Sequence, residues 1–166
     1  MGMKYWLNMI SMFIEKELYV DIIRNMPIPT VDILFLNSQN ELLLGKRNNE
    51  PLMGVYYIPG WRVNKWERSL DTAKRKATEE LGINIDISRL QFVWVYDDIF
   101  EGSAFADIST HCIPVTYLYQ INSDEEPEIF LWDFQHSDLR FFSLDDPSLH
   151  EMVRMRAIDL RKLLKI

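Results

Sequence analysis

The chain has 166 residues, of which 48% are hydrophobic and 13% aromatic, enough apolar side chain for the core of one domain, so a disordered or low-complexity protein is excluded. Its 18 basic and 25 acidic residues leave a net charge of −7, which excludes a protein whose main task is to bind a nucleic-acid backbone, because that needs clustered Lys and Arg. The single Cys112 excludes an internal disulfide. No apolar run reaches the roughly 18–20 residues of a membrane span. We therefore expect a soluble, cytoplasmic domain with neither a nucleic-acid nor a membrane partner.

We expect the chain to divide into an N-terminal extension, residues 1–11, and one domain, residues 12–166. From Met12 onward the apolar residues fit one face of a helix. Pro27 and Pro29 end this helix, because proline lacks the amide hydrogen that a helix interior needs.

Beyond these prolines, apolar and β-branched runs alternate with turn signals. Strands are predicted at residues 30–37, 41–44, 55–58, 90–96, 113–121, 128–131 and 139–142. One helix is predicted over residues 70–81, with Ser69 as its N-cap and Gly82 as its C-terminal stop. Another begins at a capping box formed by Ser148 and Glu151 and runs to about residue 164. This order predicts an α+β fold with a mixed sheet and flanking helices.

Two groups of carboxylates are candidates for a site. Asp32 lies in an otherwise apolar strand, where a carboxylate is costly unless it is paired. On the helix at 70–81, Arg75 and Lys76 precede Glu79 and Glu80 by four residues, so each acid can pair with a base on a solvated helix face. Adjacent carboxylates near a glycine loop also suit a hard divalent cation, which prefers oxygen ligands and bridges to phosphate.

The segment that contains this helix, IPGWRVNKWERSLDTAKRKATEELGI at residues 58–83, resembles the Nudix box, G-x5-E-x7-R-E-U-x-E-E-x-G-U with U aliphatic. The matching residues are Glu67, Arg75, Ala77, Glu79, Glu80, Gly82 and Ile83. Trp61 stands in place of the first glycine, and Lys76, which cannot ligate Mg²⁺, replaces the first helix glutamate. The resemblance implies the Nudix α/β/α sandwich, a mixed β-sheet between helices.

Beyond the box, the chain from about Met12 is similar to the GDP-mannose mannosyl hydrolases, which have a degenerate box and attack the sugar carbon rather than phosphorus. The similar runs are residues 32–47, 54–60, 96–102, 109–111 and 134–138. The most specific element is the pair Gln135-His136.

This resemblance implies a nucleotide-sugar substrate whose diphosphate is held by Mg²⁺ or Mn²⁺, and it implies a homodimer. The implied ligands are the Gly60 carbonyl, the Glu80 carboxylate and the Gln135 amide oxygen. Glu79 is a further candidate ligand, because it is more acidic than the residue that these hydrolases usually have there. The implied general base is His136, and the residues implied at the phosphates and in the substrate site are Arg47, Arg62, Arg75, Asp32 and Tyr96.

We therefore predict hydrolysis of GDP-mannose, or a close GDP-hexose, to GDP and free sugar by water attack at the anomeric carbon, where a good leaving group and an activated water are needed. If Glu79 and Glu80 together hold metal, the alternative is a pyrophosphohydrolase that attacks the phosphorus of a nucleotide sugar or nucleoside triphosphate. If Trp61 and Lys76 mark a decayed site, the alternative is a module that binds nucleotide sugars without turnover. Glu67 is expected to orient Arg75 rather than to bind metal.

Overall fold

The computed structural model describes residues 14–105, 108–123, 125 and 136–166. Its helices are α2 (Lys16–Asn25), α3 (Ser69–Leu81) and α4 (Glu151–Leu164), with a 3₁₀ turn at Ile87–Arg89. Its strands are β1 (Ile28–Leu36), β2 (Glu41–Arg47), β3 (Tyr56–Tyr57), β4 (Gly60–Arg62), β5 (Gln91–Val95), β6 (Asp98–Phe100), β7 (Thr110–Gln120) and β8 (His136–Ser143). Three predicted features lie outside the described residues: the extension at 1–11, the strand at 128–131 and Gln135.

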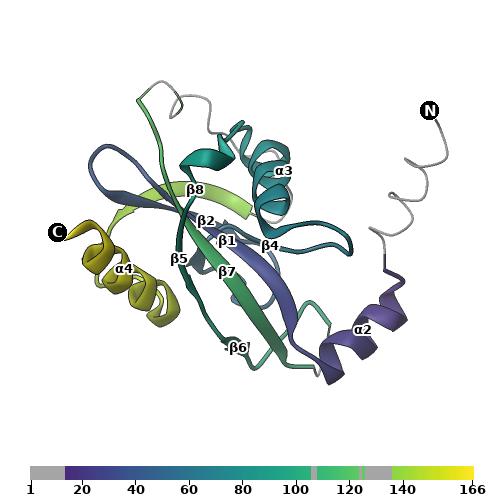
Figure 1. The fold of residues 1–166 in the computed structure, drawn as a ribbon. Helices are drawn as coiled ribbons and strands as arrows, with labels where there is room; N and C mark the ends of the chain where they lie inside the picture. The colour runs from purple at the N-terminus through teal and green to yellow at the C-terminus, as the bar shows by residue number, and fades with distance from the viewer. Residues whose placement is uncertain (1–13, 106–107, 124, 126–135) are drawn as a thin grey trace, which may run out of the picture.

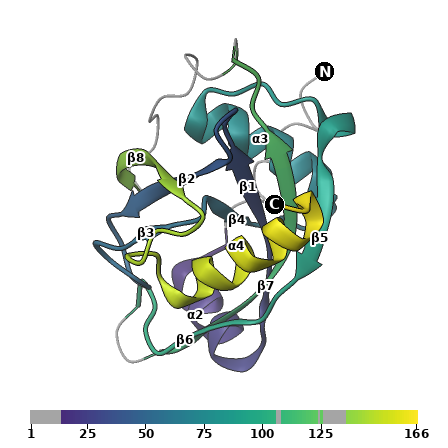
Figure 2. The ribbon, with the colours of Figure 1, turned by 90° about the vertical axis from the view of Figure 1, so that its left-hand side faces the viewer.

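Strand β1 is the centre of the sheet (Figure 1). It pairs in parallel with β7 along its whole length, from Ile28 opposite Cys112 to Leu36 opposite Gln120, and antiparallel with β2 and β4. The strand order is β3-β2-β1-β7-β5, and β4, β6 and β8 pair with β1, β7 and β2. Helices α3 and α4 lie on opposite faces (Figure 2), so the predicted α/β/α sandwich with a mixed sheet is confirmed.

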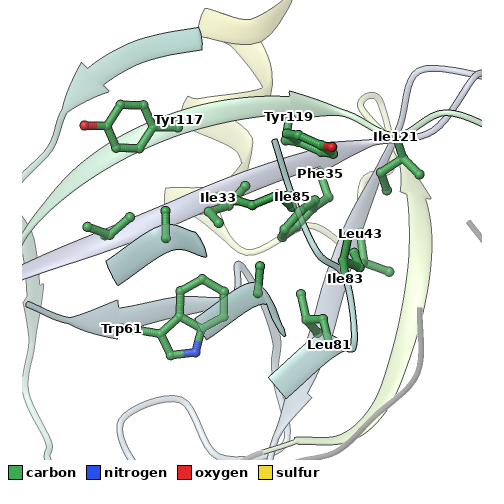
Figure 3. Packing of buried hydrophobic residues seen from close by; sticks show 13 residues of the cluster. Ile33, Phe35, Leu43, Trp61, Leu81, Ile83, Ile85, Tyr117, Tyr119 and Ile121 are labelled. Atoms are coloured by element: carbon green, nitrogen blue, oxygen red, sulfur yellow. The ribbon is translucent and has the colours of Figure 1, made fainter. Parts of the chain in front are cut away.

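Alternation along β1 builds a separate apolar core on each face of the sheet. Val31, Ile33 and Phe35 pack in a cluster with α3, where Figure 3 shows Trp61 among the buried side chains. The even-numbered Leu34 and Leu36 pack instead with β2 and the buried face of α4. The central strand is therefore buried on both faces, as its apolar sequence predicts.

The predicted N-caps of both helices are wrong. Ser69 is the first residue of α3 rather than its cap, and its hydroxyl shares a 2.8 Å hydrogen bond with the Tyr117 hydroxyl. In front of α4, the Ser148 hydroxyl donates to Asp146, and His150 caps the helix by accepting from the Met152 amide at 3.4 Å. The predicted stop at Gly82 is confirmed by its left-handed φ of 71°, a conformation that glycine adopts without a Cβ penalty.

Two short strands that the sequence analysis does not predict lie where the site forms. Residues 60–62 read as a loop after the Pro-Gly turn, but they form β4 and pair with residues 30–32 of β1. Residues 98–100 form β6 against the first part of β7. Three residues are too few for an alternating pattern, and both strands owe their existence to long neighbours. In the described part of the chain, no helix has the length and apolar character that crossing a membrane requires.

Candidate functional site

A cavity of about 380 Å³ lies where α2, β1, β4, β6 and the loop after β2 meet. Apolar side chains such as Ile23, Ile28, Ile58 and Phe100 form part of its wall. Its charged residues are Asp32, Arg47, Glu50, Arg62 and Asp98, and Gly60 and Cys112 also line it. The cavity has the size and mixed lining of a small-ligand site.

Four of the predicted site residues therefore meet at one cavity: Asp32, Arg47, Gly60 and Arg62. The Arg47 side chain is oriented by its Nε, which donates to the Pro51 carbonyl at 2.6 Å. Burial lowers the pKa of Arg47, although a guanidinium stays charged at neutral pH. Arg62 lies over the Tyr19 ring of α2 at 5.6 Å. Two positive groups thus reach the cavity from β2 and β4.

The floor of the cavity is a buried ion-pair network that the sequence analysis misses. Arg156 of α4 is 1% exposed and donates to Asp32 at 3.3 Å and to Asp98 at 2.7 Å. The Tyr57 hydroxyl also donates to Asp98, at 3.0 Å. Burial raises the pKa of Asp32 to about 7 against the opposing charge of Arg156. The costly carboxylate of Asp32 is therefore paired, and its partner is a residue to which the sequence analysis assigns no role.

The position of Arg156 on α4 is the sequence signal that points to its buried ion pair. It lies three residues after Val153 and four before Leu160, both fully buried, so it shares their face of the helix. A positive residue on a buried helix face, in a chain with a carboxylate in its central strand, predicts an ion pair.

Gly60 allows β4 to approach the Asp32 carboxylate. The two residues are opposite each other in the β1–β4 pairing, and a Cβ on Gly60 would overlap Asp32 Oδ1. The carbonyl of Gly60, a predicted metal ligand, thus lies in the backbone that borders the cavity.

His136 is buried at the start of β8, opposite Arg47 of β2. The register of β2 and β8 shifts between Lys46 and Arg47, next to this pair. A Cβ on Gly45 would lie 2.5 Å from the imidazole Cδ2, so the absence of a side chain at residue 45 makes room for the ring. His136 does not line the cavity itself, but its strand neighbour Arg47 does.

Tyr96 and Arg75 lie elsewhere. The Tyr96 hydroxyl donates to Asp159 of α4 at 2.9 Å, and Arg156 stacks over its ring at 4.2 Å. Arg75 makes a two-pronged ion pair with Glu67, at 2.6 and 2.7 Å, so the expected orienting role of Glu67 is confirmed. These hydrogen bonds outweigh the effect of burial and lower the pKa of Glu67. Neither Tyr96 nor Arg75 lines the cavity.

Glu80 faces away from solvent on α3, and both of its oxygens accept hydrogen bonds. Lys76 Nζ donates to Oε1 at 2.7 Å, and the Trp61 indole nitrogen donates to Oε2. Glu79 is half exposed and lies 3.3 Å from Arg75 and 3.4 Å from Lys76. Both residues that depart from the Nudix box therefore contact the carboxylate that the box assigns to metal.

These donors do not fit a resident Mg²⁺ as they stand. Mg²⁺ needs short bonds to oxygens in an octahedral arrangement, whereas an ammonium and an indole already occupy Glu80. Within the described ranges, no cluster of three or more His, Cys, Asp and Glu side chains has metal-site geometry. Gln135 is not among the described residues.

Comparison with known proteins agrees with this fold and box. The NUDIX domain family model matches residues 26–164. The low-salt glycan biosynthesis protein Agl8 of Haloferax volcanii is 32% identical over 134 residues, which are 80% of this chain and 81% of the relative. The chain therefore belongs to the NUDIX family, and its fold and box define it as a Nudix hydrolase.

Solved structures share the fold. A MutT NUDIX hydrolase from Burkholderia pseudomallei is 25% identical with a TM-score of 0.66, over 82% of this chain and 99% of its own. The NUDIX domain of Shewanella oneidensis NrtR, solved with ADP ribose, is 16% identical with a TM-score of 0.66, over 99% of both chains. Nudix hydrolases generally use divalent metals. A bifunctional enzyme from Francisella tularensis was solved with AMP and a manganese ion. It is 18% identical with a TM-score of 0.57, over 90% of this chain and 44% of its own.

Replacing Arg156 by methionine tests the floor of the cavity. We expect Arg156→Met to lower the free energy of unfolding by about 3–5 kcal/mol, because it leaves two buried carboxylates without their cation. Urea denaturation measures the change. The control is Lys162→Met on the same helix, whose partner Asp159 is exposed enough that the loss stays within about 1 kcal/mol. Equal losses in the two variants would contradict a structural role for the buried network.

A double-mutant cycle tests the approach of Gly60 to Asp32. Gly60→Ala should lower the free energy of unfolding by about 1–3 kcal/mol, because its Cβ overlaps the carboxylate. In an Asp32→Ala background the overlap is gone, and Gly60→Ala should have little effect. A cost of Gly60→Ala that is the same in both backgrounds would show that Asp32 is not the obstacle.

Proposed function

We propose that this Nudix hydrolase cleaves a nucleotide diphosphate sugar, GDP-mannose or a close GDP-hexose, to GDP and free sugar. In this reaction water attacks the anomeric carbon, the bond from that carbon to the diphosphate oxygen breaks, and its electrons leave with GDP. One water proton goes to a general base and the other stays on the new sugar hydroxyl.

The observation that carries the proposal is the pairing of charges in the cavity. Arg47 and Arg62 bring two guanidinium groups to a cavity that Asp32 and Asp98 also line. Guanidinium groups bind phosphate oxygens through paired donors, and buried carboxylates accept hydrogen bonds from hydroxyl groups. A diphosphate next to the arginines would place a sugar toward the carboxylates. The arginines would also neutralise the charge that develops on the leaving GDP.

His136 is the proposed general base. An imidazole can exchange a proton near neutral pH, and its strand position opposite Arg47 puts it beside the residue that would hold the diphosphate. The name of the Haloferax relative connects that protein with glycan biosynthesis, and a sugar-containing substrate here agrees with it.

The pattern of contacts on α3 favours attack at carbon over attack at phosphorus. The phosphorus alternative needs Glu79 and Glu80 to hold metal together, but Lys76 contacts both carboxylates. The sequence predicts Mg²⁺ or Mn²⁺. Because Glu80 already accepts hydrogen bonds from Lys76 and Trp61, no step of the proposed reaction is assigned to a cation. The homodimer and the cytoplasmic location implied by the sequence stay predictions.

Product analysis tests the proposal, with His136→Gln as the decisive variant. We expect wild-type protein to convert GDP-mannose to GDP and mannose, and His136→Gln to lower kcat by about 10²- to 10⁴-fold, which is the usual contribution of a general base. Chromatography of the nucleotide product and a coupled assay for mannose measure both quantities, with Mg²⁺ and with EDTA.

His111→Gln is the matched control, because His111 lies in β7, pairs with the exposed Asp97 at 3.1 Å and does not line the cavity. Its kcat should stay within about twofold of wild type. GMP and mannose 1-phosphate as products would establish the phosphorus alternative. Tight binding of GDP-mannose without any product would favour the binding module.

A further inference from the structure

We infer that Lys76 and Trp61 take the place of a divalent cation at Glu80, so that the Nudix box of this protein carries its own internal cation. The inference rests on the proposed function only for its turnover assay. Its main evidence is that the two residues that depart from the box, fifteen positions apart in sequence, converge on one carboxylate.

A buried carboxylate needs compensation, and Glu80 is 5% exposed. Each of its oxygens has its own donor: the Lys76 ammonium at Oε1 and the Trp61 indole at Oε2. A charge-assisted hydrogen bond to an ammonium at 2.7 Å also neutralises the charge. Glu80 is therefore stabilised in the folded protein without a metal ion.

The Trp61 indole has a reason to make this contact. Its ring packs in the apolar cluster between the sheet and α3 (Figure 3), and Trp61 is 4% exposed. An indole N–H in such a place needs an acceptor. Glu80, which lies on the next turn of α3 after Lys76, supplies it. Trp61, in place of the glycine of the box, and Lys76, in place of its first helix glutamate, thus donate to the same carboxylate.

Lys76 also limits what Glu79 can do. Its ammonium lies 3.4 Å from Glu79 and 2.7 Å from Glu80, while Arg75 lies 3.3 Å from Glu79. A divalent cation that used these carboxylates would have to displace the ammonium and share the space with its charge. Divalent affinity at this box is therefore low, and removal of Lys76 raises it.

Titration of the full-length protein with Mn²⁺, followed by electron paramagnetic resonance of the free ion, tests this directly. We expect wild type to show no tight Mn²⁺ site at the box, and Lys76→Glu to bind Mn²⁺ at least about tenfold more tightly and to gain thermal stability from it. Lys74→Glu, which makes the same charge change at an exposed position of α3, should behave as wild type.

If Lys76→Glu does not fold, Lys76→Met, which keeps the length of the side chain, and Trp61→Phe, which keeps an aromatic ring, each remove one donor to Glu80, and Mn²⁺ affinity should rise in both. A tight Mn²⁺ site in wild type that Glu80→Gln abolishes would overturn the inference. So would variants at Lys76 and Trp61 whose affinity equals that of wild type.

The turnover assay separates this inference from the proposed function. If both are right, GDP-mannose hydrolysis by wild type persists in EDTA. If no nucleotide sugar is hydrolysed under any condition, the proposed function fails, and the Mn²⁺ titration still decides the role of Lys76. Hydrolysis that EDTA abolishes and Mn²⁺ restores, together with Mn²⁺ binding lost in Glu80→Gln, would overturn the inference and leave the proposed function standing.

Discussion

The contact of Arg156 with Asp32 and Asp98 is the constraint on which the rest of the site depends. Two buried carboxylates repel each other and are costly to bury, and one guanidinium that donates to both offsets that cost. Asp32 belongs to β1, Asp98 to β6 and Arg156 to α4. One interaction therefore joins the central strand, a short strand that pairs with β7, and the last helix, and it fixes two carboxylates that line the cavity.

The sequence predicted what local patterns control. The helix of the box, its stop at Gly82 and the apolar central strand follow from periodicity and capping chemistry, and the structure agrees with them. Helix periodicity places Arg156 on the buried face of α4, but it does not say which carboxylate it meets, because Arg156 and Asp32 are 124 positions apart. Nor does a local pattern predict β4 and β6, which are strands only because β1 and β7 supply their backbone partners. Ser69 and Ser148 met the rules for N-caps, but each hydroxyl has another partner.

Four residues that the resemblance implies for the site, Asp32, Arg47, Gly60 and Arg62, line one cavity. The sequence motif could not show that two departures from the box act as one. Taken separately, Lys76 is a lost metal ligand and Trp61 is a bulky residue in a turn. In the folded protein both donate to Glu80. A consensus motif records which residue is replaced, whereas the consequence of the replacement depends on what the new side chain contacts.

The central claim is that water attacks carbon, and the position of isotope in the nucleotide product tests it most directly. GDP-mannose is hydrolysed in ¹⁸O-labelled water, and the GDP is examined by mass spectrometry, because the anomeric hydroxyl of free mannose exchanges with water whereas phosphate oxygens do not. The account predicts GDP without label. Label in GDP or in GMP would mean that water attacked phosphorus, and it would contradict the assignment of His136 and the cavity to attack at the sugar.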